Sequence, residues 1–172
     1  MPYAVELYFD TDAERRIRHL WQAIATAGVR FIPLEIGARP HSSLTAFDEV
    51  DASALMMTIQ SLSRQNDPLE ILFASIGCFA RDHGVVFIAS VVHADLLALH
   101  SNFHNLLHRS GLSSNSLYVP GNWVAHCTIA PQLSPREIAQ VFQIALSSDA
   151  LGAAHCTEIA LVQYHPVREI AR

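Results

Sequence analysis

The chain has 172 residues, of which 51% are hydrophobic, so it can bury the core of one domain, or of one domain built from two similar halves. Its net charge of −5 excludes a long basic track for nucleic acid. All 11 basic residues are arginine, which excludes mechanisms that need a lysine nucleophile or a P-loop lysine.

Three cysteines, Cys78, Cys127 and Cys156, form no Cys-x-x-Cys pair, so we expect a reducing cytoplasm rather than a disulfide framework. The first ten residues are acidic and alternating, unlike a signal peptide. The longest apolar run, Val85 to Val92, is too short to span a membrane, so we expect no membrane partner. Nothing in the sequence specifies an oligomeric state.

The first half of the chain, about residues 1–80, predicts strands where apolar residues alternate and helices where they recur three and four positions apart. Thr11 begins a capping box for the first helix, and Asp51 is the candidate N-cap of the second. In chain order we expect a strand at Tyr3 to Phe9, a helix from Thr11 to Gly28, strands at Phe31 to Ile36 and His41 to Phe47, a helix after Asp51, and a strand at Leu69 to Ile76.

The second half, about residues 81–172, repeats this order of elements. We expect a strand at Val85 to Val92, a helix at Ala94 to Arg109, a loop with a short strand near Tyr118, a strand at Trp123 to Ala130, a helix from Pro135 and a strand at Cys156 to Tyr164. We therefore predict a single domain with an α+β fold, made of two pseudo-repeated lobes that bring corresponding strands to a shared cleft.

Corresponding strands in the two halves carry the same short pattern. His41 and Ser43 share one face of a strand, as do His126 and Thr128, because strand side chains alternate between faces. An imidazole beside a hydroxyl is suited to handling a phosphate. The pattern also occurs at His108, on a helix, and at His155, which we expect to be a surface-exposed coincidence. The shared context of the pair at His41 and His126, half a chain apart, is the stronger signal.

Pro40-His41-Ser42-Ser43-Leu44 and Ala125-His126-Cys127-Thr128-Ile129 resemble the paired motifs of the 2H phosphoesterase superfamily, most closely its bacterial 2′-5′ RNA ligase-like, cyclic phosphodiesterase group. The resemblance covers essentially the whole chain. It implies a bilobal fold with two mainly antiparallel sheets flanked by helices around a central cleft, and metal-independent phosphodiester chemistry without a cofactor. Two positions depart from the family pattern: Ser43 stands where threonine is commoner, and Ser42 where an apolar residue is usual.

Two histidines on facing strands suit the hydrolysis of a 2′,3′-cyclic phosphate on a nucleotide or an RNA end. One ring takes a proton from water and the other gives a proton to the leaving oxygen, and the sequence leaves open which is which. Ser43 and Thr128 would donate to the non-bridging oxygens. The alternatives are a 2′-5′ RNA ligase or 2′-5′ phosphodiesterase activity in the same cleft, and a non-catalytic nucleotide-binding module.

Weaker candidates surround these motifs. Arg39 could reach a phosphate or lie in solvent, and Tyr118 and Trp123 could stack on a base or serve packing. His100, His104 and His108 follow the helical spacing of some metal ligands, but no nearby carboxylate or cysteine completes a site. We therefore expect these three histidines to form a solvated polar face.

Overall fold

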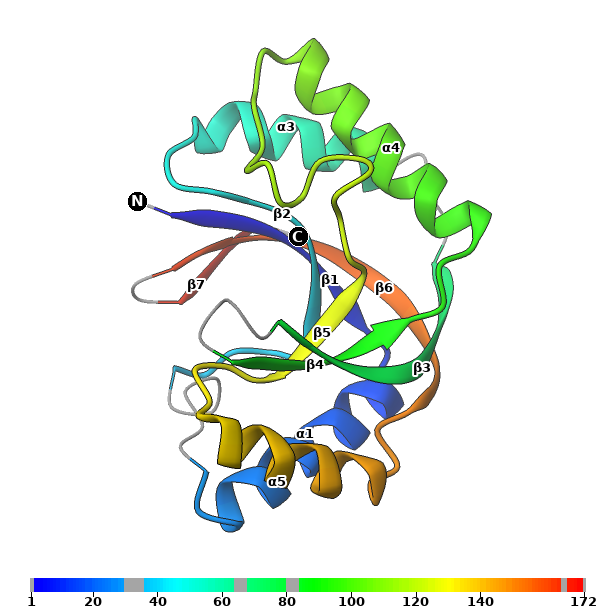
Figure 1. Cartoon of the computed structure of the whole chain (residues 1–172). Coiled ribbons are helices and arrows are strands. Elements are labelled where there is room, and N and C mark those ends of the chain that lie inside the picture. Colours follow the sequence, from blue (N-terminus) through cyan, green and yellow to red (C-terminus); the bar gives the residue numbers. More distant parts are fainter. Residues whose placement is uncertain (1, 30–35, 64–67, 80–83, 165–166, 172) are drawn as a thin grey trace.

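A computed structural model describes residues 2–29, 36–63, 68–79, 84–164 and 167–171 (Figure 1). Strands and helices follow one another in an α+β arrangement, as the sequence predicts. The elements are β1 (Tyr3–Phe9), α1 (Thr11–Thr26), β2 (His41–Phe47), α3 (Ala52–Ser63), β3 (Leu69–Phe79), β4 (Val85–Ser90), α4 (Ala94–Arg109), β5 (His126–Ala130), α5 (Pro135–Leu146), β6 (Gly152–Gln163) and β7 (Arg168–Ala171). The short strand expected at Phe31 to Ile36 falls almost wholly outside the described residues.

The strands form one antiparallel sheet of seven strands in the order β2-β1-β6-β3-β4-β5, with β7 paired to β6. Antiparallel pairing is confirmed, but the expectation of two separate sheets is wrong. Strand β6 begins at Gly152 rather than Cys156, and its added residues pair with β3 from Leu69↔Cys156 to Phe73↔Gly152. That pairing joins the group β2-β1-β6 to the group β3-β4-β5 in one sheet.

The sheet is curved, and its two edge strands come together. β2 and β5 lie at opposite ends of the strand order, yet they are in contact (Figure 1). The indole N–H of Trp123, just before β5, donates to the Ser43 carbonyl of β2 over 2.9 Å. Helices α3 and α4 pack together at one end of the sheet, and α1 and α5 at the other. The curvature therefore brings the two motif strands side by side.

Local sequence signals explain most helix boundaries. Ser134 and Glu137 form a capping box at the start of α5, and Asp51, the predicted N-cap, accepts from two backbone N–H groups at the start of α3. For α1 the prediction is off by one residue, because the Asp10 carboxylate rather than Thr11 accepts from the first free N–H groups. Gly28 follows α1 with φ +82°, a conformation that glycine adopts without strain.

The helices bury apolar residues spaced three and four positions apart. α1 buries Ile17, Leu20, Trp21 and Ile24, and α4 buries Leu96, Leu99, Phe103 and Leu107. Strand β5 begins at His126, three residues later than predicted. No helix in the described ranges is both long and apolar enough to cross a membrane.

Candidate active site

The two motif histidines occupy equivalent positions on neighbouring edge strands. His41 is the first residue of β2 and His126 the first residue of β5. Nδ1 of His41 lies 2.7 Å from the Arg39 carbonyl, and Nδ1 of His126 lies 2.7 Å from the Val124 carbonyl. A carbonyl oxygen can only accept, so each Nδ1 carries the hydrogen. Nε2 is therefore the nitrogen of each ring that can take or give a proton.

His126 lies in an aromatic setting. Its ring centroid is 5.0 Å from that of Phe79 and 5.0 Å from that of Phe87. Burial lowers the pKa of His126, and the nearby His41 ring lowers it further, against the opposing effect of the Val124 carbonyl. Gly77 permits this packing, because a Cβ there would lie 2.4 Å from the Phe87 ring. His126 is thus kept neutral beside apolar rings.

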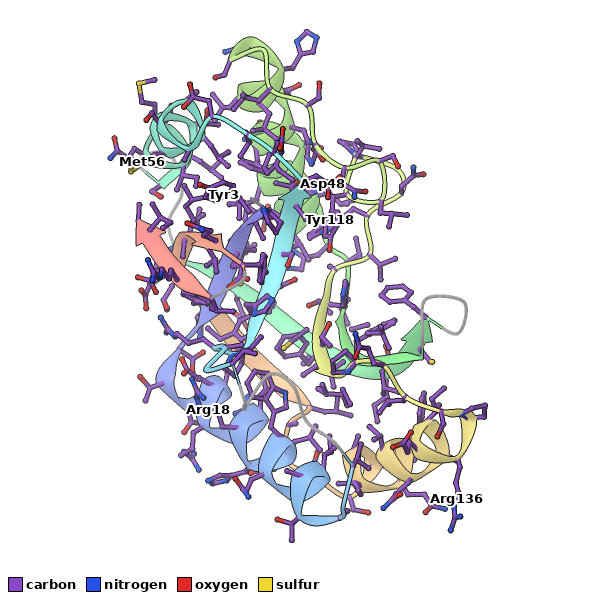
Figure 2. The ribbon with its side chains drawn as sticks, turned by 90° about the vertical axis from the view of Figure 1, so that its left-hand side faces the viewer. Tyr3, Arg18, Asp48, Met56, Tyr118 and Arg136 are labelled. Atoms are coloured by element: carbon purple, nitrogen blue, oxygen red, sulfur yellow. The ribbon has the colours of Figure 1, made fainter. Side chains whose placement is uncertain are left out.

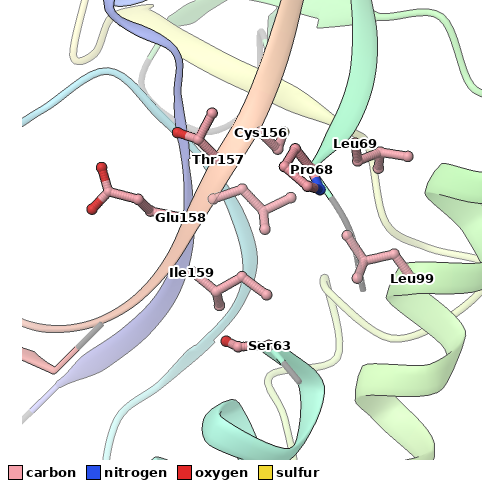
Figure 3. Close-up of a pocket in the computed structure, with 9 residues that line it drawn as sticks. Ser63, Pro68, Leu69, Leu99, Cys156, Thr157, Glu158 and Ile159 are labelled. Carbon is pink, nitrogen blue, oxygen red and sulfur yellow. The ribbon is translucent and has the colours of Figure 1, made fainter. Parts of the chain in front are cut away.

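A cavity of about 400 Å³ opens beside His126. His126 and Thr128 line it together with Phe79, Leu117, Tyr118 and Trp123. A smaller cavity of about 100 Å³ lies where β6 meets the segment before β3 and the helix α4 (Figure 3). Its walls include Leu69, Leu99, Cys156 and Ile159, while the Glu158 carboxylate points away from them (Figure 3). Of these two cavities, the one of about 400 Å³ is the one lined by the motif residues His126 and Thr128.

His41 faces a buried carboxylate that the sequence analysis did not identify. Glu6 is 2% exposed on β1, where it pairs with Ser43. Its Oε1 lies 3.4 Å from Nε2 of His41 and accepts a short hydrogen bond from the Tyr164 hydroxyl. Tyr8 is hydrogen-bonded to the same carboxylate. The signal in the sequence was a lone charged residue within the apolar strand Tyr3 to Phe9.

The two motif hydroxyls follow their histidines by two residues on the same strands. The Tyr118 hydroxyl is hydrogen-bonded to the Ser43 side chain, and Figure 2 shows Tyr118 beside β2. Thr128 lines the 400 Å³ cavity two residues after His126. The intervening Ser42 and Cys127 are 4% and 1% exposed, so the alternation between faces is as the strand pattern predicts.

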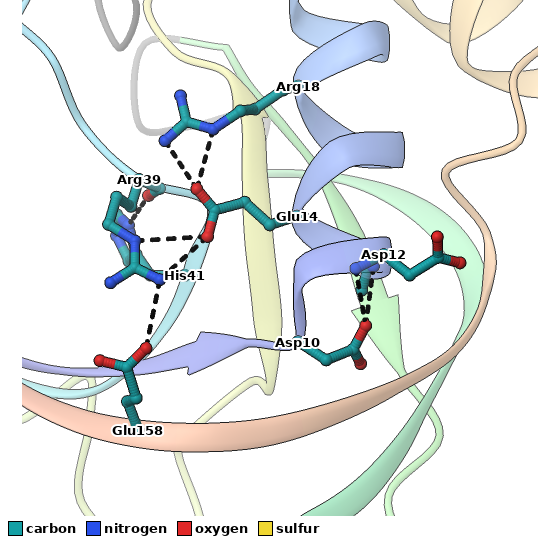
Figure 4. A network of polar contacts seen from close by, with 8 residues as sticks. Asp10, Asp12, Glu14, Arg18, Arg39, His41 and Glu158 are labelled. Atoms are coloured by element: carbon teal, nitrogen blue, oxygen red, sulfur yellow. Dashed lines mark hydrogen bonds and ion pairs between the residues drawn. The ribbon is translucent and has the colours of Figure 1, made fainter.

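Arg39 lies next to His41, but its charge is balanced by carboxylates (Figure 4). Its Nη2 is 2.9 Å from Glu14 and 3.4 Å from Glu158, and its guanidinium lies 4.0 Å over the Tyr8 ring. Arg39 is therefore held by ion pairs rather than free in bulk solvent. These contacts fix the turn whose carbonyl orients the His41 ring.

The chain is similar to known proteins over almost its whole length. The model of a protein family described as the 2′-5′ RNA ligase superfamily matches residues 9–168. The chain belongs to the 2′-5′ RNA ligase superfamily. No match among curated protein sequences reaches significance.

Solved structures support the fold of this superfamily member. E. coli LigT in its apo form superimposes with a TM-score of 0.62 at 17% identity, over 99% of this chain and 94% of LigT. LigT complexed with 3′-AMP gives 0.61 at 17% identity, over 100% and 96%. Kluyveromyces marxianus Usb1 gives 0.53 at 14% identity, over 99% and 98%. At such identities the likeness shows a shared fold.

The histidine row of α4 does not behave as a solvated face in this superfamily member. His100 is 2% exposed, stacks on Trp123 with centroids 4.0 Å apart at 4°, and bonds to the Tyr118 carbonyl. His104 is half-buried, and only His108 is exposed. The prediction fails because the loop before β5 covers this face of α4. Among the described residues, no group of three or more His, Cys, Asp or Glu could hold a metal ion.

Burial of His100 predicts an acid-sensitive stability. Desolvation, followed by the neighbouring His104, lowers the pKa of His100 from 6.5 to about 4. Between these values the unfolded chain binds a proton that the folded protein does not, so the free energy of unfolding should fall by about 2 to 3 kcal/mol as the pH drops from about 6.5 to about 4. Urea unfolding at several pH values measures this loss. His100→Phe, which keeps a ring against Trp123, should show a flatter pH dependence, and an unchanged slope would contradict the assignment.

Proposed function

We propose that this chain is a metal-independent phosphodiesterase that hydrolyses the 2′,3′-cyclic phosphate of a nucleotide or an RNA end. The observation that carries the proposal is the matched orientation of His41 and His126, each with Nδ1 2.7 Å from the carbonyl two residues earlier. Two equivalently oriented rings on adjacent strands are what an in-line displacement needs, with a base on one side of phosphorus and an acid on the other. Membership in the 2′-5′ RNA ligase superfamily supports the same chemistry.

The reaction consumes one water. One histidine takes a proton from the water as its oxygen bonds to phosphorus, the bond from phosphorus to one ribose oxygen breaks, and the other histidine gives that oxygen a proton. Ser43 and Thr128 donate to the non-bridging oxygens, where negative charge builds up. The same groups would serve 2′-5′ ligation if a 5′-hydroxyl took the place of water: one histidine takes its proton as the oxygen bonds to phosphorus, and the other protonates the departing 3′ oxygen. Ligation is the activity for which the superfamily is named.

The cavity beside His126 suits a nucleoside. At about 400 Å³ it lies within the usual size range of small-molecule sites, and Tyr118 and Trp123 offer aromatic surface to a base. LigT has been solved with 3′-AMP, a nucleoside monophosphate of the size that ring opening would release. Arg39 would bind a phosphate only by exchanging a carboxylate partner, so we propose that it chiefly holds the His41 turn. The three free cysteines agree with a reducing, cytoplasmic setting.

Turnover of 2′,3′-cyclic nucleotides in excess chelator tests this proposal. We expect hydrolysis to a single nucleoside monophosphate, followed by ³¹P NMR, at a rate that EDTA does not change. A 2′-5′-linked dinucleotide, assayed in parallel, tests the ligase and 2′-5′ phosphodiesterase alternative. Tight binding of a nucleotide without turnover of either substrate would overturn the proposal in favour of a binding module, and loss of turnover on chelation would overturn its metal-independent part.

A further inference from the structure

The two motif histidines have the same backbone contact but opposite surroundings. Nε2 of His41 lies 3.4 Å from the Glu6 carboxylate. The His126 ring instead has the rings of Phe79 and Phe87 as its neighbours, each at 5.0 Å. An anion beside a ring favours its protonated form, and an apolar setting favours its neutral form. The site is therefore chemically asymmetric although its motifs are alike.

Both nitrogens of His41 lie near oxygen atoms, one at hydrogen-bond distance and the other at ion-pair distance. Nδ1 donates to the Arg39 carbonyl, and Nε2 faces Oε1 of Glu6. The Tyr164 hydroxyl donates to that same oxygen, and the carboxylate is almost entirely shielded from water. A buried carboxylate needs such compensation, and a cationic ring beside it would supply the balancing charge.

We propose that Glu6 is a positioning residue that keeps Nε2 of His41 protonated, so that His41 is the acid and His126 the base of the reaction. This assignment rests on the proposed function for its catalytic meaning. His126 takes the proton of the attacking water on Nε2 as the new P–O bond forms. The ribose oxygen leaves with the proton from Nε2 of His41. Exchange with solvent then moves one proton from His126 to His41, and the Glu6 carboxylate draws it to the ring.

The other titratable groups around this pair do not replace Glu6. Burial raises the pKa of each of the three nearby tyrosines, so their hydroxyls stay neutral donors; they are Tyr8 on β1, Tyr118 before β5 and Tyr164 after β6. Two further carboxylates, Glu14 on α1 and Glu158 on β6, bind Arg39 instead. The negative charge of Glu169 on β7 contributes to the raised pKa of Tyr8. Glu6 is thus the carboxylate that is paired with His41 among the described residues.

The direct test follows the histidine ring protons of the whole protein by ¹H NMR during a pH titration, with His41→Ala and His126→Ala identifying the two rings. In the unmodified protein we expect His41 to titrate at a higher pH than His126. In Glu6→Gln, which keeps the shape and the Tyr164 contact, the His41 midpoint should move to lower pH. The matched control Glu158→Gln, a carboxylate on the same face that binds Arg39, should leave that midpoint in place.

Kinetics give the second readout. The reaction needs the proton on His41, so kcat/KM should fall at high pH as His41 loses it. In Glu6→Gln this fall should begin at a lower pH, by the same amount as the His41 midpoint moves in the NMR titration. A lower rate with the fall at an unchanged pH would indicate a merely structural role and overturn the proposal. The reverse titration order in the unmodified protein would also overturn it, whether or not the Gln variant folds. Because the NMR titration needs no substrate, it stands even if the cyclic nucleotides are not turned over.

Discussion

His41→Ala and His126→Ala are each expected to lower the turnover of a 2′,3′-cyclic nucleotide by about 10²- to 10⁴-fold, the usual contribution of a positioned acid or base. Each ring is oriented by a backbone carbonyl at 2.7 Å, so truncation removes the proton carrier without removing its scaffold. Steady-state kcat and KM measure the loss. We expect it in kcat, because proton transfer occurs in the transition state rather than in substrate binding.

A matched control for these variants is His155→Ala. His155 has the same short pattern, His-Cys-Thr, but its side chain is 54% exposed and contacts Asp10 at 3.6 Å. Its removal should leave kcat and KM unchanged. The double variant of His41 and His126 should lose less than the product of the single losses, since base and acid act in one step. Near-normal kcat in both single variants would rule out this mechanism.

The candidate site could be predicted only as far as it depends on local pattern. His41, Ser43, His126 and Thr128 follow from the strand alternation, and the half-chain repeat separates them from His155. The Glu6 contact depends on the register in which β1 pairs with β2, and apolar alternation does not specify which strand is the neighbour. The ion pairs of Arg39 were also not predictable from local pattern, because its partners Glu14 on α1 and Glu158 on β6 lie far from it in the sequence.

The fold shows the same division between local and long-range determinants. Helix α4 matches its predicted bounds because apolar spacing and Gly111 are local signals. Burial of His100 was missed because it depends on Trp123, which lies far along the chain and covers the helix. The single sheet was missed because residues 152–155 lack a strong alternating pattern and become strand through pairing with β3. Contacts with other parts of the fold determine whether such segments form strands.

The hydroxyls of the two motifs give the second large expected effect. Ser43→Ala and Thr128→Val should each lower kcat for a cyclic nucleotide by about 10²-fold, the usual cost of removing one donor to a developing negative charge. The hydroxyl-retaining controls Ser43→Thr and Thr128→Ser should keep most of the activity. Trp123 donates to the backbone carbonyl of Ser43, so that contact between the edge strands remains in every Ser43 variant.

A Tyr118 variant can distinguish a catalytic role of the Ser43 hydroxyl from a packing role. The Ser43 side chain is hydrogen-bonded to the Tyr118 hydroxyl, so Ser43→Ala also leaves that hydroxyl without its partner. Tyr118→Phe removes the same contact but retains the Ser43 hydroxyl. If Ser43 acts on the phosphate, Ser43→Ala should be much slower than Tyr118→Phe, whereas equal losses would assign Ser43 to orienting the loop before β5. Thr128 lines the cavity, and its loss should appear in kcat alone.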